Sequence, residues 1–167
     1  MSIWYEFEEL DSFTTGAIGQ PGQRTFFLQI RAGHQHIAVK CEKQQVAAMA
    51  DYLNKVLVDL PPPEDRPMPA ALELRDPVEA EFVLGTIGLG YEPGADRIVV
   101  QLDEMVPTDD EGTPLVEDQS QIRVHLSRGQ AVAFCEHATG VVEAGRPPCR
   151  WCQEPIDPDG HACARMN

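Results

Sequence analysis

Two stretches of this chain resemble each other so closely that we expect one folding unit to occur twice. Residues 13–19 read Phe-Thr-Thr-Gly-Ala-Ile-Gly and residues 82–88 read Phe-Val-Leu-Gly-Thr-Ile-Gly, so four of seven positions match. Shorter matches follow in the same order: 27–30 with 99–102, 37–39 with 122–124, and 45–48 with 130–133. Because chance rarely reproduces a common order of matches, the sequence predicts two copies related by pseudo-twofold symmetry.

Each copy has the pattern of three strands followed by one helix. A Pro-Gly turn separates the first strand from the second in both copies, since proline presets one turn position and glycine accepts the positive φ of the next. The second strands are rich in β-branched and aromatic residues, and the helices carry apolar residues every three or four positions. The second strands, third strands and helices are expected at 24–30 and 97–102, 36–40 and 121–126, and 42–60 and 128–144. A further strand is expected at 3–10, with 72–74 as its counterpart in the second copy.

These elements predict an α+β fold made of a duplicated strand-strand-strand-helix unit with a small C-terminal zinc knuckle. The strands of both copies are expected to join one sheet, against which the apolar stripes of the two helices pack. The strand order between the copies is not readable from the sequence. The expected sections are the first repeat, a proline-rich linker, the second repeat and the knuckle, at 1–60, 61–70, 71–145 and 146–167.

The C-terminal segment has the residue spacing of a structural zinc site. Cys149, Cys152, His161 and Cys163 form the pattern C-x2-C-x8-H-x-C. Two cysteines two residues apart can direct both thiolates at one centre, and a second pair about ten residues further on completes a tetrahedron. Thiolate and imidazole ligands suit zinc. Because all four ligands come from the protein, we expect a structural zinc ion rather than a catalytic one.

Other interpretations of the same cysteines remain open. A redox-active CxxC pair is one, although the helical context of such motifs is missing here. Thiols without a metal are another. If His161 is not the fourth ligand, Cys135 or His137 on the second helix is the alternative, because that helix leads directly into the tail.

Two motifs resemble a known protein family. The run from Phe13 to Gln29 contains Gly-Gln-Pro-Gly-Gln-Arg-Thr-Phe-Phe-Leu-Gln and is similar to the opening of a family of bacterial repeat proteins, domain of unknown function 3090. The ending, Gly-Arg-Pro-Pro-Cys-x-x-Cys followed by Pro-Asp-Gly-His-x-Cys, resembles the tail of the same family. The likeness covers essentially the whole chain. It implies a cytoplasmic role and brings no activity with it.

Outside the zinc pattern, Gly19–Thr25 is the best candidate for a binding loop. Its glycines expose backbone N–H groups, and Arg24 can hold a carboxylate or phosphate through two hydrogen bonds. A tight hairpin turn explains the same residues equally simply. If the two copies enclose a ligand between them, the expected lining residues are Arg24, Gln29, Arg97 and Gln101.

The formal net charge of −14 restricts the partners of this chain. With 27 acidic against 13 basic residues, a broad phosphate-binding surface and docking on anionic lipid are both disfavoured. No apolar run approaches the length of a membrane span, and the N-terminal residues lack the pattern of a signal peptide, so a cytoplasmic location is expected.

The sequence offers no recognisable catalytic constellation such as GxSxG or HExxH. We therefore expect a zinc-binding interaction or adaptor module with a protein partner. The alternative is a small-molecule enzyme or ligand-binding protein with its site between the two repeats. Nucleic-acid binding through the locally basic tail ranks third because of the overall acidity.

Overall fold

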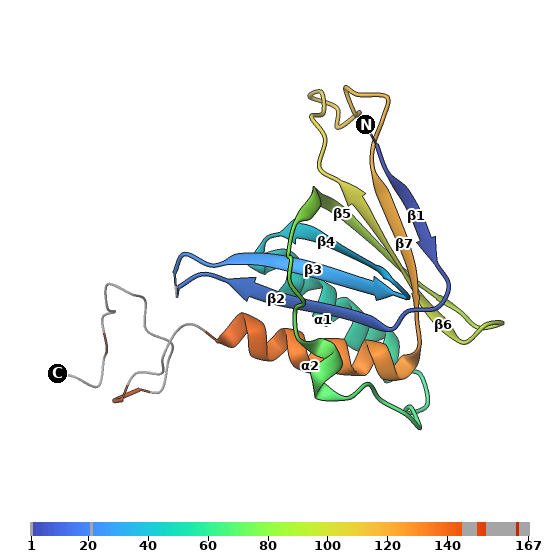
Figure 1. The fold of residues 1–167 in the computed structure, drawn as a ribbon, viewed down its shortest axis with the longest axis vertical. Coiled ribbons are helices and arrows are strands. Elements are labelled where there is room, and N and C mark those ends of the chain that lie inside the picture. Colours follow the sequence, from blue (N-terminus) through green and yellow to red (C-terminus); the bar gives the residue numbers. More distant parts are fainter. Residues whose placement is uncertain (1, 21, 145–149, 153–162, 164–167) are drawn as a thin grey trace.

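A computed structural model shows an α+β fold with one seven-stranded sheet and two α-helices packed on one of its faces (Figure 1). It describes residues 2–20, 22–144, 150–152 and 163. The α+β class agrees with the sequence prediction. Within these residues, no helix is long and apolar enough to cross a membrane.

Two antiparallel three-stranded meanders make up most of the sheet. The strands are β1 (Trp4–Phe7), β2 (Ser12–Ile18), β3 (Thr25–Ala32), β4 (Gln35–Cys41), β5 (Ala80–Glu92), β6 (Arg97–Glu104) and β7 (Gln121–Leu126). Their order in space is β1-β7-β6-β5-β4-β3-β2. The meanders β2-β3-β4 and β5-β6-β7 meet where β4 pairs with β5 in parallel, and β1 adds to β7 in parallel. The first strand of the chain thus completes the second meander.

Each meander is followed by a helix that begins at a capping box. The helices are α1 (Lys43–Val58) and α2 (Arg128–Glu143). Glu42 and Gln45 form the capping box of α1, and Ser127 and Gln130 form that of α2. A capping box satisfies two of the backbone N–H groups that a helix start leaves without partners. Each helix therefore starts directly after a residue whose side chain takes part in capping it.

The core lies between the inner face of the sheet and the two helices. Alternate residues of the strands point inward and are buried, as the period of two in a strand requires. The largest fully buried side chains include Phe13, Leu28, Ile30, Met49, Leu53, Leu84, Ile98, Leu102, Ile122, Leu126 and Phe134. Burying each such side chain contributes about 1.5–3 kcal/mol.

The second and third strands of the two meanders share one pairing register. Ile30 lies opposite Ile37 in the β3-β4 pair, and Leu102 lies opposite Ile122 in the β6-β7 pair. These are the residues that the sequence matches place in correspondence. The same correspondence holds along both strand pairs. Two residues that lie opposite each other in the first meander therefore have counterparts that lie opposite each other in the second.

The helices repeat their buried positions as well. Val46, Met49, Ala50 and Leu53 are buried in α1, and Ala131, Phe134, Cys135 and Ala138 are buried in α2. The two sets occupy the same positions when each helix is counted from its first residue, Lys43 in α1 and Arg128 in α2. The Cys135 Sγ lies 3.5 Å from the carbonyl oxygen of Ala50, so these two counterparts touch each other.

The first-strand match, by contrast, is out of register. Phe13 lies opposite Ile30, so its structural counterpart is the residue opposite Leu102, which is Ile87 and not Phe82. The cause is strand length, since β5 has 13 residues and β2 has seven. The shared motif reaches the end of β2, whereas in β5 four residues of the strand follow it. The sequence match therefore misplaced this strand by five residues.

The predicted strand at 72–74 is wrong. Residues Pro69–Leu72 form a short 3₁₀ helix, η1, and the chain then runs without strand structure to β5. This segment crosses the outer face of the first meander (Figure 1). The hydroxyl groups of Ser12 and Thr14 donate to its carbonyl oxygens at Ala71 and Leu72. Because side chains of the sheet bond to its backbone, the segment needs no strand partner.

The strand predicted at 3–10 is present as β1, and its counterpart is the start of β5. Glu6 of β1 pairs with Arg123 of β7, and Ala80 of β5 pairs with Ala38 of β4. Ala38 and Arg123 occupy corresponding positions in their meanders. Each third strand thus receives a parallel neighbour from the other half of the chain.

Candidate functional site

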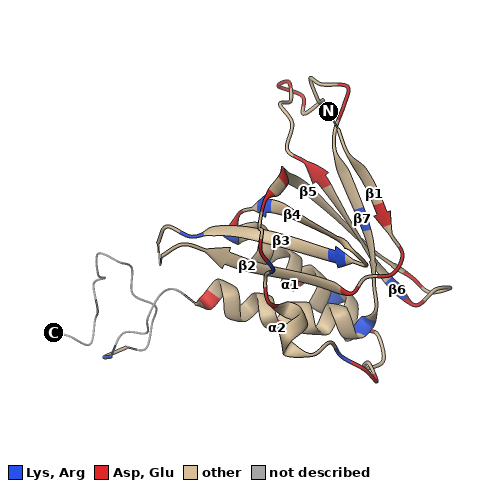
Figure 2. Ribbon diagram, viewed as in Figure 1, with Lys and Arg blue, Asp and Glu red and all other residues tan. Residues whose placement is uncertain are grey.

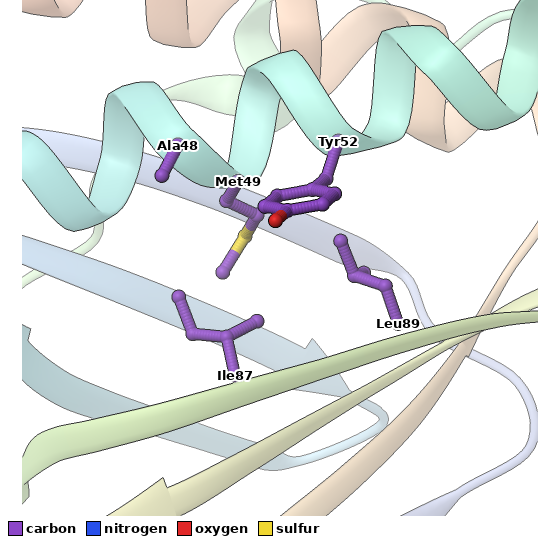
Figure 3. A pocket seen from close by; sticks show the side chains of 5 residues that line it. All are labelled: Ala48, Met49, Tyr52, Ile87 and Leu89. Carbon is purple, nitrogen blue, oxygen red and sulfur yellow. The ribbon is translucent and has the colours of Figure 1, made fainter.

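An open apolar groove lies between α1 and β5. It encloses about 320 Å³ and is lined by Ala48, Met49, Tyr52, Ile87 and Leu89. Figure 3 shows the Met49 and Tyr52 side chains on the helix above Ile87 and Leu89 on the strand. Tyr52 is 60% exposed at the rim of this groove. The volume falls at the lower end of the range for ligand-binding clefts.

The corresponding joint between α2 and β2 is closed. On the strands, the strand pairing described above makes Phe13 the counterpart of Ile87 and Thr15 the counterpart of Leu89. On the helices, the counterparts of Ala48, Met49 and Tyr52 are Ala133, Phe134 and His137, in that order. The Phe13 and Phe134 rings pack with their centroids 4.8 Å apart. The Nε2 atom of His137 lies 2.9 Å from the carbonyl oxygen of Thr15. These contacts join helix and strand directly.

Side-chain identity explains why one joint is closed and the other open. Met49 and Ile87 stand where the closed joint has two phenylalanines, and the aliphatic side chains fill less of the space between helix and strand. Ala48 is exposed, whereas its counterpart Ala133 is only 3% exposed. Ile87 and Leu89 are half-buried, whereas their counterparts Phe13 and Thr15 are buried. The groove is thus a local difference between the two helix–strand joints.

The part of β5 that lines the groove is also a free strand edge. β5 pairs with β4 only through Ala80–Val83, and from Leu84 onward it pairs with β6 alone. The Nε2 atom of Gln45 donates to the carbonyl oxygens of Leu84 and Gly85 at 3.2 and 3.0 Å. Beyond that point, no side chain in the described part of the chain caps the backbone of Thr86–Tyr91 on its open side. An open edge carries unpaired N–H and C=O groups.

Two of the predicted ligand residues, Arg24 and Gln29, serve the fold. Arg24 donates from its guanidinium to the carbonyl oxygen of Val141 at 3.0 Å and lies over the Phe26 ring. Gln29 is 2% exposed and bonds to both backbone groups of Arg75, each at 2.8 Å. Arg24 thereby ties the β2-β3 turn to the end of α2, and Gln29 holds the segment that crosses the sheet.

The other two predicted ligand residues, Arg97 and Gln101, lie elsewhere on the sheet. Arg97 donates to the carbonyl oxygen of Asp96 at 3.1 Å. Gln101 belongs to a network on the outer face, where it donates to Asp103 and accepts from Arg123 at 2.7 Å. The structure brings none of the four predicted ligand residues into hydrogen-bonding contact with another. Their role in binding stays a prediction.

The two isolated cysteines are buried thiols within the body. Burial, and to a smaller extent the nearby Glu42, raise the pKa of Cys41 to about 12. Burial also raises the pKa of Cys135 to about 11, with smaller effects from Glu136 and Asp51. Both thiols stay protonated at neutral pH. A thiol in that state is a poor nucleophile and a poor metal ligand.

The predicted zinc ligands lie only partly within the described residues. Cys149 and His161 fall outside them, whereas Cys152 is half-buried and Cys163 is 8% exposed. No group of three or more potential metal ligands occurs among residues 2–20, 22–144, 150–152 and 163. That set omits two of the four predicted ligands. The alternative ligand His137 is bonded to Thr15 in the closed joint.

Sequence reasoning missed the groove because it assigned the helix stripe to the core alone. Met49 belongs to that stripe and is 1% exposed. Tyr52, one turn further along, extends the apolar surface toward solvent. The signal that could have revealed the groove is that Ile87, and not Phe82, occupies the position of Phe13. The sequence match of residues 13–19 with 82–88 concealed this correspondence.

Comparison with known proteins gives one family. The family described as "Protein of unknown function (DUF3090)" matches residues 5–163, nearly the whole chain. No curated protein and no solved structure matches.

Proposed function

The chain belongs to the DUF3090 family, and within it we propose a zinc-binding protein-interaction module that holds an apolar segment of a partner between α1 and β5. The open groove carries this proposal. A soluble protein gains stability by burying apolar side chains, and the closed α2-β2 joint demonstrates how this fold can do so. Leaving the corresponding joint open, with Tyr52 exposed beside it, makes sense when a partner completes it.

The proposal includes a duplicated unit as the origin of the two halves. Three observations support it: equal pairing registers in the second and third strands, equal buried positions in the two helices, and a capping box at the start of each helix. The contact between Ala50 and Cys135 supports a pseudo-twofold axis close to these two residues, since counterparts meet only near such an axis. In this view the groove is the place where two copies of one unit have diverged.

Zinc is proposed as the stabiliser of the C-terminal segment. Cys149, Cys152, His161 and Cys163 would hold it, and their donor set of three thiolates and one imidazole suits the ion. Burial of Cys163 fits a ligand role. The bond of His137 to Thr15 and the raised pKa of Cys135 both favour His161 over these residues as the fourth ligand. Bound metal would contribute folding energy to a segment with little core of its own.

The groove favours binding over chemistry. Tyr52 is the single ionisable side chain among its five lining residues. Catalytic sites ordinarily combine several titratable groups with perturbed pKa values. An enzymatic role therefore has less support at this position than the holding of an apolar segment.

The test is an affinity capture from cells that make this protein, with matched variants of one helix. Tyr52→Arg places a charge in the groove, and Val58→Arg places the same charge on an 81% exposed residue of the same helix. We expect a partner to be recovered with the wild type and with Val58→Arg and to be lost with Tyr52→Arg. Recovery of the same proteins with all three would contradict the proposed role of the groove.

Metal content is measured on the same samples by elemental analysis. We expect stoichiometric zinc in the wild type and in Tyr52→Arg, and a marked loss in Cys152→Ser. A wild-type protein purified without chelators that holds no zinc would refute the metal part of the proposal.

A further inference from the structure

The geometry points to strand addition: we propose that an extended, basic segment of a partner protein pairs with the free edge of β5 and places alternate apolar side chains in the groove. This deepens the proposed function and rests on it. Two features meet here, an apolar groove and an unpaired backbone edge. Recognition by added strands uses both, because backbone hydrogen bonds supply affinity and pockets for alternate side chains supply specificity.

Comparison of the two corresponding edges supports the inference. The edge of β2 is capped at one point, because His137 bonds to the carbonyl oxygen of Thr15. In the described residues, the matching stretch of β5 has no equivalent cover past Gly85. Natural sheets usually cap, shorten or charge their exposed edges. The uncovered stretch of β5 is therefore the exception to explain.

The register indicates which backbone groups are available. Thr15 turns its carbonyl oxygen to the free edge of β2, where His137 reaches it. Leu89 holds the corresponding place in β5, so we expect its backbone groups to face the open edge too. In an antiparallel pair, hydrogen-bonded and outward-facing residues alternate. Ile87 and Tyr91 should then share this orientation.

Charge selects the kind of partner. The chain has 27 acidic and 13 basic residues, and Figure 2 shows acidic residues on β1, near the start of β5 and in the loop after β6. Several arginines are already engaged, such as Arg128 with Asp96 and Arg66 with Glu136. Over the chain as a whole this acidic excess attracts a positively charged segment, although Lys55, whose ammonium lies 5.4 Å from the centroid of the Tyr52 ring, places one positive charge beside the groove. The partner segment should thus alternate apolar with basic or neutral residues.

The test uses a defined probe, a peptide of alternating valine and lysine about eight residues long. Two isomers are made, one N-methylated on every valine and the other on every lysine. In an extended strand all valine N–H groups face one side and all lysine N–H groups face the other. Strand addition therefore predicts that one isomer loses at least about tenfold in affinity while the other binds like the parent peptide. Binding is read from amide chemical shifts of Thr86–Tyr91 in the full-length protein.

Matched protein variants locate the site. Met49→Phe with Ile87→Phe rebuilds the aromatic pair of the closed joint and should abolish binding, whereas Val58→Phe should leave it unchanged. Tyr52→Arg serves the same purpose if the double variant does not fold.

Three results would overturn the inference. Equal binding of both isomers would exclude backbone pairing, and no shift change along β5 would exclude the site. Slow amide exchange of Thr86–Tyr91 in the full-length protein without peptide would mean that a second copy or the chain's own tail already covers the edge. Sedimentation would distinguish these two explanations, because only the first requires a dimer. If capture depends on Tyr52 but both isomers bind alike, the proposed function stands without strand addition. If only one isomer binds but the same proteins are captured with Tyr52→Arg as with the wild type, the edge of β5 can accept a strand but the proposed binding of a cellular partner in the groove is wrong.

Discussion

Truncating corresponding residues in the two joints should cost very different amounts of stability. Phe13 is 2% exposed and packs on Phe134, whereas Ile87 is half-buried beside the open groove. A buried Phe→Ala change costs about 3–5 kcal/mol, and an aromatic pair contributes about 0.5–1.5 kcal/mol beyond its area. We expect Phe13→Ala to lower the free energy of unfolding by about 4 kcal/mol. Ile87→Ala removes a side chain still in contact with solvent and should cost about 1–2 kcal/mol, toward or below the low end for buried isoleucine.

Urea unfolding followed by circular dichroism measures both variants. Because the two changes expose similar surface on unfolding, the slopes should match and the midpoints should differ. Phe13→Leu serves as a control that keeps most of the apolar volume and should fall between them. Equal losses for Phe13→Ala and Ile87→Ala would mean that the two joints are equally packed. The groove would then not be an open version of the closed joint.

Further variants test other parts of the structure. Gln29→Leu removes both hydrogen bonds to Arg75 and should lower the free energy of unfolding by about 2–4 kcal/mol. Gln101→Leu, in the network on the outer face, should lower it by under about 1 kcal/mol. Equal, small effects in the same urea assay would restore Gln29 as a ligand candidate. The hydrogen bond from Tyr91, and to a smaller extent Arg128, hold the pKa of Asp96 below its ordinary value of 3.8. As the pH falls, the Asp96 carboxylate is therefore protonated in the unfolded chain before it is protonated in the folded one, and the free energy of unfolding declines below about pH 4. Asp96→Asn should lack this part of the decline, and identical pH profiles of wild type and variant would count against the interaction of Asp96 with Tyr91 and Arg128. Cys41 and Cys135 should resist iodoacetamide at pH 8 in the folded protein and react in urea, as mapped by mass spectrometry; rapid labelling of the folded chain would refute their raised pKa values.

Local patterns predicted most of the secondary structure. The apolar spacing of the helices and the β-branched second strands depend on neighbours in the sequence, and the structure places these elements close to the predicted bounds. The third strands followed for the same reason. Where local chemistry decides, the sequence is sufficient.

Features that depend on distant partners were missed or misplaced. The motif beginning at Phe82 matches Phe13 in sequence, yet its place is set by pairing with β4, which no local pattern reveals. The segment at 72–74 has strand-like residues but is held by hydroxyl groups of β2 and by Gln29. The ligand residues were chosen by type, and the fold had already engaged Gln29 and Arg24 with backbone carbonyls. The groove itself exists only as a difference between two joints.

Amide hydrogen exchange along β5 decides whether the groove is a docking site. The exchange of Thr86–Tyr91 is compared with and without the captured partner, and the exchange of Phe13–Ala17 in β2 provides the internal reference. Docking predicts that alternate amides of β5 slow strongly on addition of the partner while those of β2 keep their rates. Unchanged exchange in β5, or equal slowing on both strands, would contradict docking at this groove.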